Sequence, residues 1–370
     1  MPDPQRHISA FEQANPQAVE SPRPSYDPTN AFLSILRDEA QSHVVLDTEH
    51  ARGFLDAAPY CPGHCLLVPK AAGYASMLDL PQKAAEQVLR EGPRLARAVA
   101  KATGCDGVNV WQNNGPAARQ EVFHLSVHIF PRSHGDDMAA MMAKRQPLPR
   151  EQSDAIAGRI RQALATDEEP SVGGNDSLAG ERPSRTDVDR PRPHYDPGNV
   201  FLKIINGEAP SYQVLETEHV LGFLDAFPVW PGHCLIIPKT AGYASMLDLP
   251  QKAAEQVLRE VPRLARAVAK ATGCDGVNVW QNNGPAANQV TFKLLLWLSA
   301  GWCCVLRSHN SLTVVLGSGC IPPPCACAAA LLRRRRGGAS RSPQTSHPRG
   351  FALDGRKDQG RTGRRRRAIA

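Results

Sequence analysis

The chain lacks the features that would place it in a membrane or outside the cell. The uncharged stretch Leu294–Leu306 is too short to span a bilayer, and the stretch 312–332 is interrupted by Pro322–Pro324. The first residues are polar and contain no apolar core of the kind found in a secretory signal. We therefore expect no membrane association and an intracellular location, in the cytoplasm, the nucleus or both.

Cysteine pairs of the kind that hold metals are also scarce. Five of the ten cysteines lie in the last 80 residues, and the others sit in apolar surroundings. The pair Cys61 and Cys65 could contribute to a zinc site, but the second half of the chain keeps only Cys234 at the matching positions. The sequence therefore predicts reduced, buried thiols, with no metal site and no cofactor.

Excess positive charge is absent from most of the chain. The formal net charge is +7, yet residues 291–370 alone carry +13 and the other 290 residues carry −6. An acidic body gives no support for nucleic-acid binding. The alternative is binding through the basic tail, which contains the runs Arg333–Arg336 and Arg364–Arg367.

What the chain does contain is a tandem repeat. Residues 26–118 recur 169 positions later, and Gly73–Ala118 returns as Gly242–Ala287 with one change, Gly92 to Val261. Such a repeat predicts two copies of one structural unit. We expect the following organisation: a disordered N-terminus 1–25, a first domain 26–166, a linker 167–194, a truncated second domain 195–290, and an aberrant or disordered basic tail 291–370.

Apolar periodicity and turn residues predict the elements of the first copy. Asp79 is the expected N-cap of a long helix, Pro93 its expected kink and Gly104 its end. The other expected elements are the helices Ala31–Glu39 and Arg150–Leu164 and the strands Ser42–Asp47, Ala51–Asp56, His64–Pro69, Gly107–Gln112 and Phe123–Phe130, with the long helix at 80–103.

One expected strand carries the residues best suited to catalysis or ligand binding. In His124-Leu-Ser-Val-His-Ile-Phe130, strand periodicity places His124, Ser126 and His128 on one face, with alternate residues about 6.6 Å apart. Two imidazoles beside a glycine-containing loop could hold a small anionic group. The alternative is a pair of core or surface histidines on an edge strand.

The wider sequence resembles the histidine triad (HIT) superfamily across nearly all of the first copy. Each matching segment is weak alone, but the segments follow the family order at the family spacing. They are Ala31-Phe-Leu-Ser-Ile-Leu36, Gly53-Phe-Leu-Asp56, Pro62-Gly-His-Cys-Leu-Leu-Val-Pro-Lys70, Gln112-Asn-Asn-Gly-Pro116 and His124-x-Ser-x-His-Ile-Phe-Pro-Arg132.

The resemblance implies an α+β fold, with an antiparallel five-stranded sheet and helices, in two tandem copies of which the second is incomplete. It implies a purine-nucleotide site in a homodimer or an intramolecular pseudo-dimer. By matching position, the base would lie against Phe32, Ile35 and Phe54, the ribose against Asp56, and the phosphate against Asn113 and the backbone around Gln120, with His64, His124 and His128 as the histidine cluster. Each of these residues could instead have a purely structural role.

The sequence departs from the family pattern at the position that matters most. In the family, the middle histidine attacks the α-phosphorus and forms a covalent intermediate that water releases. Here that position is Ser126, a poor nucleophile without a base. Arg119 also replaces a small residue of the phosphate loop. At the three triad positions the second copy has Lys293, Leu295 and Trp297.

Two hypotheses of different kinds remain open. The first is a nucleotide hydrolase or transferase acting on phosphoanhydrides or phosphoramidates, including dinucleoside polyphosphates, and impaired at Ser126. The second is a non-catalytic nucleotide-binding or scaffold module that kept the pocket and lost the nucleophile.

Overall fold

The computed structural model describes residues 24–170, 195–291, 294, 296–300, 303–308 and 311–316. Most of the N-terminus expected to be disordered, most of the expected linker and the far end of the expected tail lie outside these ranges. Among the described residues, no helix is long and apolar enough to cross a membrane.

The first copy contains five strands and several helices. Its N-terminal helix is capped by Asn30, whose side chain accepts hydrogen bonds from the amides of Phe32 and Leu33. The elements are α2 (Ala31–Leu36), β1 (Val44–Asp47), β2 (Ala51–Leu55), β3 (Cys65–Pro69), η1 (Met77–Asp79), α3 (Gln82–Leu89), α4 (Glu91–Thr103), β4 (Gly107–Asn114), η2 (Pro116–Ala118), β5 (Val127–Arg132), α5 (Met138–Ala143) and α6 (Arg150–Ala165).

The second copy repeats this order as far as its last strand. Asn199 caps its first helix as Asn30 does in the first copy. The elements are α7 (Val200–Ile205), β6 (Gln213–Glu216), β7 (Val220–Leu224), β8 (Cys234–Pro238), η3 (Met246–Asp248), α8 (Gln251–Leu258), α9 (Val261–Thr272), β9 (Val277–Asn283), η4 (Pro285–Ala287) and β10 (Leu296–Ala300).

The long helix expected at 80–103 is two helices, α3 and α4, which meet at Arg90. Pro93 does not kink a helix, because it lies in the first turn of α4, where backbone amides have no partner within the helix. Asp79 does not cap the long helix: it is the third residue of η1, and its side chain completes the capping box of the N-cap Ser76. Gly104 ends α4 in the left-handed conformation, as predicted, with φ of 62°.

The ten strands of the two copies form one continuous antiparallel sheet, in the order β1-β2-β3-β5-β4-β9-β10-β8-β7-β6. The copies meet where β4 pairs with β9, and Trp111 lies opposite its own repeat equivalent, Trp280. A register in which a residue pairs with its equivalent is that of a two-fold interface. The chain is thus an intramolecular pseudo-dimer in its architecture, with five strands in each half.

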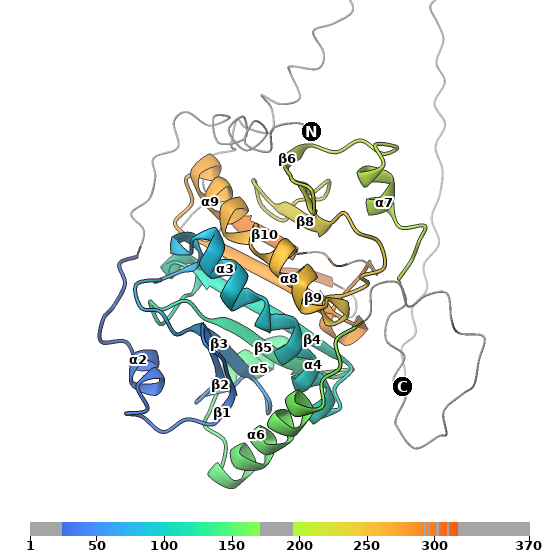
Figure 1. Ribbon diagram of the computed structural model, residues 1–370. Helices are drawn as coiled ribbons and strands as arrows, with labels where there is room; N and C mark the ends of the chain where they lie inside the picture. Colours follow the sequence, from blue (N-terminus) through green and yellow to red (C-terminus); the bar gives the residue numbers. More distant parts are fainter. Residues whose placement is uncertain are drawn as a thin grey trace, which may run out of the picture.

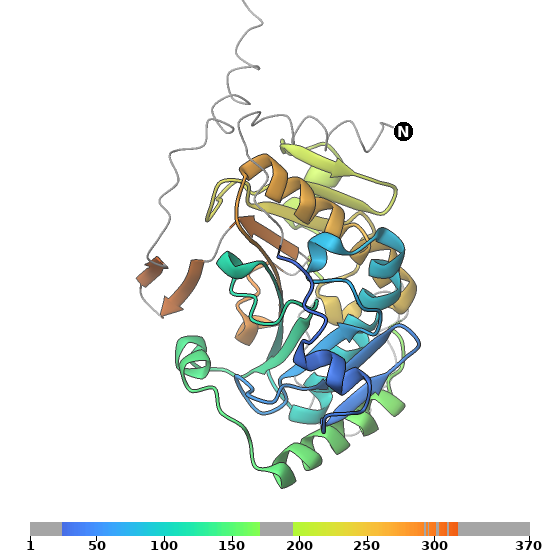
Figure 2. The same ribbon diagram turned by 90° about the vertical axis from the view of Figure 1, so that its left-hand side faces the viewer.

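Helices α3, α4, α8 and α9 cover one face of this sheet (Figures 1 and 2), whereas the short helices α2 and α7 pack against apolar residues of the opposite face. Helix α4 packs against β5 and against α6, and α9 packs against β10. The apolar residues of the strands that face these helices form one core across both copies. This core occupies one face of the sheet. The opposite face is therefore the side on which polar and aromatic side chains can form a site.

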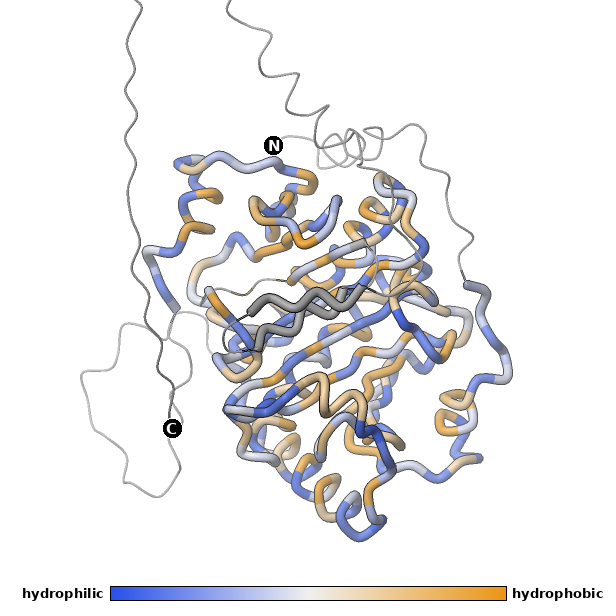
Figure 3. The backbone as a smooth tube through the Cα atoms, turned by 180° about the vertical axis from the view of Figure 1, so that it is seen from behind, coloured by the Kyte–Doolittle hydropathy of each residue, from blue (hydrophilic) through white to orange (hydrophobic). Residues whose placement is uncertain are grey.

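Asparagine side chains join the two copies at the centre of the sheet, where Figure 3 shows hydrophilic colour among the hydrophobic strands. Asn109 donates to Asn282 Oδ1 at 2.7 Å, and Asn278 donates to Asn113 Oδ1 at 2.8 Å. The backbones also approach closely, because a Cβ on Gly107 would lie 2.8 Å from the Ala287 nitrogen. Buried amide pairs of this kind fix the register of the central strands.

The second copy extends beyond the expected boundary at residue 290. Strand β10 pairs with both β8 and β9, which is the place that β5 takes in the first copy. Leu296 and Leu298 are buried in the shared core, so an apolar run replaces the alternating pattern of β5 without loss of the strand. The expected disordered tail also includes a two-stranded hairpin, β11 (Cys303–Ser308) with β12 (Ser311–Leu316).

Candidate functional site

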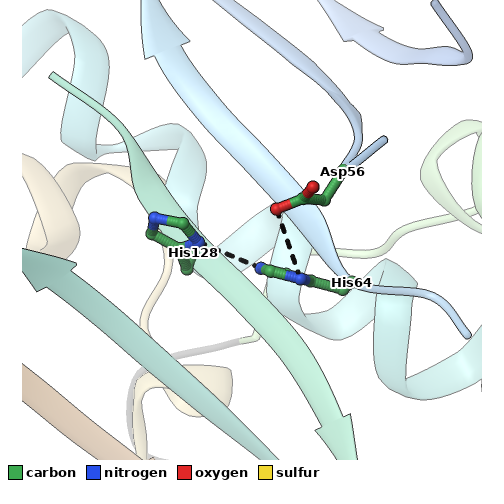
Figure 4. Close-up of side chains that lie close together, drawn as sticks. All are labelled: Asp56, His64 and His128. Atoms are coloured by element: carbon green, nitrogen blue, oxygen red, sulfur yellow. Dashed lines mark hydrogen bonds and ion pairs between the residues drawn. The ribbon is translucent and has the colours of Figure 1, made fainter. Parts of the chain in front are cut away.

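Three of the expected site residues lie in a row on the face of the sheet opposite α3 and α4 (Figure 4). Asp56 follows β2, His64 precedes β3, and His128 lies on β5. His64 Nε2 and His128 Nδ1 are 3.1 Å apart, and Asp56 Oδ2 lies 3.5 Å from His64 Nδ1. Asp56 and His128 therefore approach opposite nitrogens of one imidazole. Ligand atoms of the three side chains all lie within 4.8 Å of one another, so this group is also one that can hold a metal ion.

His124 lies apart from this row. The expected strand 123–130 begins only at Val127, so His124 and Ser126 precede β5. Leu125, Val127 and Ile129 nevertheless all lie in the shared core, while His124 contacts Phe32 of the other cluster, so alternate residues keep to opposite faces. His124 is fully buried, its Nε2 lies 2.9 Å from the Pro69 carbonyl, and its Nδ1 lies 3.0 Å from the Tyr26 hydroxyl. Because a carbonyl only accepts, Nε2 carries the proton and Nδ1 accepts from Tyr26. Both nitrogens of His124 are thus occupied.

Ser126 is also largely buried, with 9% of its surface exposed. No hydrogen bond joins its side chain to either histidine among the residues that the structure describes.

The residues expected to hold a base do come together. Phe32 and Phe54 are buried and meet edge to face, with ring centroids 5.7 Å apart. They pack with Leu66 and Val68, and Ile35 lies at the border of this cluster. The cluster covers the sheet beside His124, whose ring lies 6.1 Å from that of Phe32. An apolar wall next to the histidines suits an aromatic ligand.

The loop after β4 is held by its own side chains. Gln120 accepts a hydrogen bond from the Gly115 amide and donates to the carbonyls of Ala75 and Val122, so its side chain braces the loop and leaves only its backbone for a ligand. Asn113 receives its hydrogen bond from Asn278 of the second copy. Arg119 adopts a left-handed conformation with φ of 61°.

Two residues of the site carry no signal in the sequence pattern. Tyr60 stacks on His64 with ring centroids 4.6 Å apart and an interplanar angle of 13°. Arg145 lies 5.2 Å above the Tyr60 ring and pairs with Glu121 at 3.0 Å. Arg145 follows α5, a helix that the sequence did not predict. Only the folding of the chain brings Arg145 close to the histidines. The guanidinium supplies positive charge next to His64 and His128.

The histidines of the site are neutral at physiological pH. Burial holds the pKa of His64 well below its usual value, and the neighbouring His128 and Arg145 lower it further. Burial lowers the pKa of His128 to about 4, although Asp56 opposes this change. Burial also lowers the pKa of His124, against the hydrogen bond to Pro69. Positive charge for an anion must therefore come from arginine rather than from these imidazoles.

The second copy keeps part of the site and closes the rest. Phe201 and Phe223 form the equivalent apolar cluster, which Trp297 borders. Trp297 stands where the first copy has His128, and its ring lies 5.5 Å from that of His233. His233 Nε2 is buried without a hydrogen-bond partner, since an indole ring offers no acceptor nitrogen. An indole ring thus occupies the position that His128 has in the first copy.

A family model described as the HIT domain matches residues 37–135 and 206–295. An uncharacterized 13.2 kDa HIT-like protein of Azospirillum brasilense is 41% identical over 108 residues, which are 29% of this chain and 88% of that protein. The chain belongs to the HIT domain family. The model matches one segment in each copy, which confirms the tandem arrangement, and its second match runs past the expected boundary at residue 290.

Two relatives named as enzymes are matched over a smaller share of their length. Adenosine 5'-monophosphoramidase HNT1 of Saccharomyces cerevisiae is 37% identical over 101 residues, and the match covers 27% of this chain and 61% of the yeast protein. Adenylylsulfatase HINT3 of Arabidopsis thaliana is 42% identical over 93 residues, 25% of this chain and 47% of that protein. Among solved structures, a HIT-like protein of Bartonella henselae is 34% identical, with a TM-score of 0.35, and the match covers 38% of this chain and 99% of that one.

Proposed function

We propose that the first HIT copy binds a purine nucleotide and that its covalent chemistry is impaired. The observation that carries this proposal is Ser126, which stands where the family has its nucleophilic histidine. The base would lie against Phe32, Ile35 and Phe54, the ribose against Asp56, and the α-phosphate near Asn113 and His128. HIT relatives named as a monophosphoramidase and an adenylylsulfatase support a nucleotide whose α-phosphate carries a second, displaceable group.

The serine is a weak replacement for an imidazole. Its hydroxyl attacks phosphorus effectively only when a neighbouring base accepts the proton. His124 has no free nitrogen for this task, because Nδ1 accepts from Tyr26 and Nε2 donates to Pro69. His128 uses Nδ1 in its contact with His64. The first copy can therefore hold a nucleotide more readily than it can cleave one.

Calorimetric titration of the full chain with adenosine monophosphate tests binding, and hydrolysis of adenosine 5'-phosphoramidate tests turnover. We expect binding with little turnover, and a gain of orders of magnitude in turnover for Ser126→His, which returns the middle imidazole. Ser126→Ala is the matched control and should leave both properties unchanged. Loss of turnover in Ser126→Ala would show that the serine performs the chemistry, and absence of binding in the unmodified chain would refute the proposal.

The second candidate function is a nucleotide-binding module or scaffold without any activity. Trp297 favours it, because this ring removes the anion-facing histidine from the second copy while the copy still completes the sheet. In that case Ser126→His would bind adenosine monophosphate without turnover. Dinucleoside polyphosphates are a further ligand class for either function. Nucleic-acid binding through the basic tail concerns residues that lie outside those described.

A further inference from the structure

The hydrogen bonds that surround the phosphate position have a common direction. We infer that the protein presents only hydrogen-bond donors to the phosphate at this position. Two chains of hydrogen bonds, each anchored on a backbone group, fix these donors. The site therefore takes fully ionised phosphate without proton uptake. This inference rests on the proposed nucleotide binding by the first copy. It adds Tyr60, His64 and, from the second copy, Asn278 as positioning residues.

The first chain of hydrogen bonds begins at the backbone of Tyr60. Its amide donates to His64 Nδ1 at 3.2 Å, so that nitrogen carries no proton. The proton of a neutral His64 is then on Nε2, which donates to His128 Nδ1 at 3.1 Å. The proton of a neutral His128 is consequently on Nε2, at the edge of the ring turned away from His64. His128 thus offers an N–H without being charged.

The opposite direction would require His64 Nδ1 to donate to Asp56. The distance from Nδ1 to Asp56 Oδ2 is 3.5 Å, which is longer than an ordinary N–H···O hydrogen bond. The other oxygen of Asp56 accepts from the Ala58 amide at 2.9 Å. The shorter contact from the Tyr60 amide therefore decides the tautomer.

The charged groups around His128 do not reverse this assignment. Asp56 and Glu121 favour a proton on His128, whereas Arg145 opposes it, and burial has the largest effect. His64 is itself neutral and is coupled to His128 by the shared hydrogen bond. His128 therefore remains an uncharged donor at neutral pH.

The second chain of hydrogen bonds begins at the backbone of Ala118 and crosses from one copy to the other. Asn278 Nδ2 lies 3.1 Å from the Ala118 carbonyl and 2.8 Å from Asn113 Oδ1. Because the carbonyl only accepts, the amide of Asn278 is oriented with its nitrogen toward both oxygens. The oxygen of Asn113 is therefore occupied, and its Nδ2 hydrogens are the end left for a ligand. The second copy positions a residue of the first copy's site.

The same row of residues has a different end in the second copy. His233 lies beside Asp225 and receives a contact from the Val229 amide at 3.3 Å, as His64 does from Tyr60. Its Nε2 then meets Trp297 in place of an imidazole, and it has no partner. In the second copy, the chain of hydrogen bonds therefore ends at a buried nitrogen. In the first copy, it continues to a residue that can contact a ligand.

Histidine nitrogen NMR on the ligand-free full chain tests the tautomers directly, with His64→Gln and His128→Gln used to assign the signals. We expect both His64 and His128 to carry the proton on Nε2 and to stay neutral at pH 7. A proton on His128 Nδ1 would overturn the inference. This measurement does not depend on nucleotide binding, so it separates failure of the inference from failure of the proposed function.

Calorimetry in two buffers of different ionisation enthalpy counts the protons exchanged when adenosine monophosphate binds. A donor-only site takes up none at pH 7.5, and its affinity falls as the phosphate becomes a monoanion near its second pKa of about 6. Uptake of about one proton, with affinity rising below pH 6.5, would contradict the inference. That result would mean that an imidazole becomes charged on binding.

Two alanine variants at the interface between the copies test the second chain. Asn278→Ala removes the donor to Asn113 and should weaken adenosine monophosphate binding by about threefold to tenfold. Asn282→Ala removes the equivalent contact, in which Asn109 donates to Asn282, and should leave the affinity for adenosine monophosphate unchanged. Melting temperatures confirm that both variants are folded. Equal affinities for the two variants would remove Asn278 from the site.

Discussion

Replacing His64 or His233 by phenylalanine changes two equivalent rings of the repeat and should shift stability in opposite directions. Phenylalanine is close to histidine in shape, so packing is largely kept. Both histidines have a pKa below the usual value because of burial, so neither substitution removes a charge at pH 7.5. The difference between the variants then comes from hydrogen bonds alone.

At position 64, the substitution removes two hydrogen bonds. His128 Nδ1 loses its donor and the Tyr60 amide loses its acceptor. A buried polar group left without a partner costs about 1–3 kcal/mol, and the second hydrogen bond contributes about 0.5–1.5 kcal/mol. We expect His64→Phe to lower the free energy of unfolding by about 2–4 kcal/mol and the melting temperature by about 5–10 °C.

At position 233, the substitution removes a buried nitrogen that has no partner. The gain is about 1–3 kcal/mol, less about 0.5–1.5 kcal/mol for the contact with the Val229 amide. Val229 is 39% exposed, so water can reach that part of the loop. We expect His233→Phe to raise the melting temperature by about 2–4 °C.

Scanning calorimetry of the full chain at pH 7.5, with urea unfolding as a second probe, measures both shifts. A loss of similar size in both variants would refute the reasoning. It would mean that His233 Nε2 is satisfied in solution, by water or by the face of Trp297. Trp297→His is an independent check, because a ring nitrogen at that position gives His233 a partner.

Three further results are expected. Asp56→Ala should weaken adenosine monophosphate binding at least tenfold, because charge-assisted hydrogen bonds to ribose contribute about 1.5–3 kcal/mol, while the melting temperature falls by only a few degrees; Asp225→Ala, its counterpart in the second copy, should leave titration unchanged. Stability should fall as pH drops from about 6.5 to 4, because histidines of the unfolded chain bind protons in this range and the buried histidines of the folded chain do not. His128 alone accounts for up to about 3 kcal/mol of this loss. A melting temperature that stays constant over this pH range would contradict the prediction. Residues 26–166 expressed alone should dimerise through β4, whose partner β9 is then absent; a monomer in light scattering would show that the edge is protected in some other way.

The contacts of His124 show what sequence periodicity cannot supply. The alternation places Leu125, Val127 and Ile129 in the shared core, although β5 begins only at Val127. His124 then bonds to Tyr26 and Pro69, which lie 98 and 55 residues away in the sequence. No local pattern encodes such partners, because each contact depends on how separate elements pack.

Other parts of the site were accessible from the sequence. The Phe32 and Phe54 cluster follows from segments that resemble the HIT superfamily, and the structure brings both rings together. Tyr60 and Arg145 were missed, because a loop tyrosine and an arginine after an unpredicted helix carry no periodic signal. Tyr60 stacks on His64 and Arg145 lies over the Tyr60 ring, and both contacts form only in the folded chain.

The sequence by itself determined the repeat, the order of elements in each copy and the loss of the middle histidine. These properties follow from residue identity, from spacing and from local preferences such as the left-handed end at Gly104. Only the tertiary structure decided that the copies share one sheet, with Trp111 opposite Trp280. It also decided that an apolar run fills the place of β5 in the second copy. Strand pairing depends on which edges meet and on what each strand buries. Hydrogen bonds between distant segments then orient His64, His124 and His128.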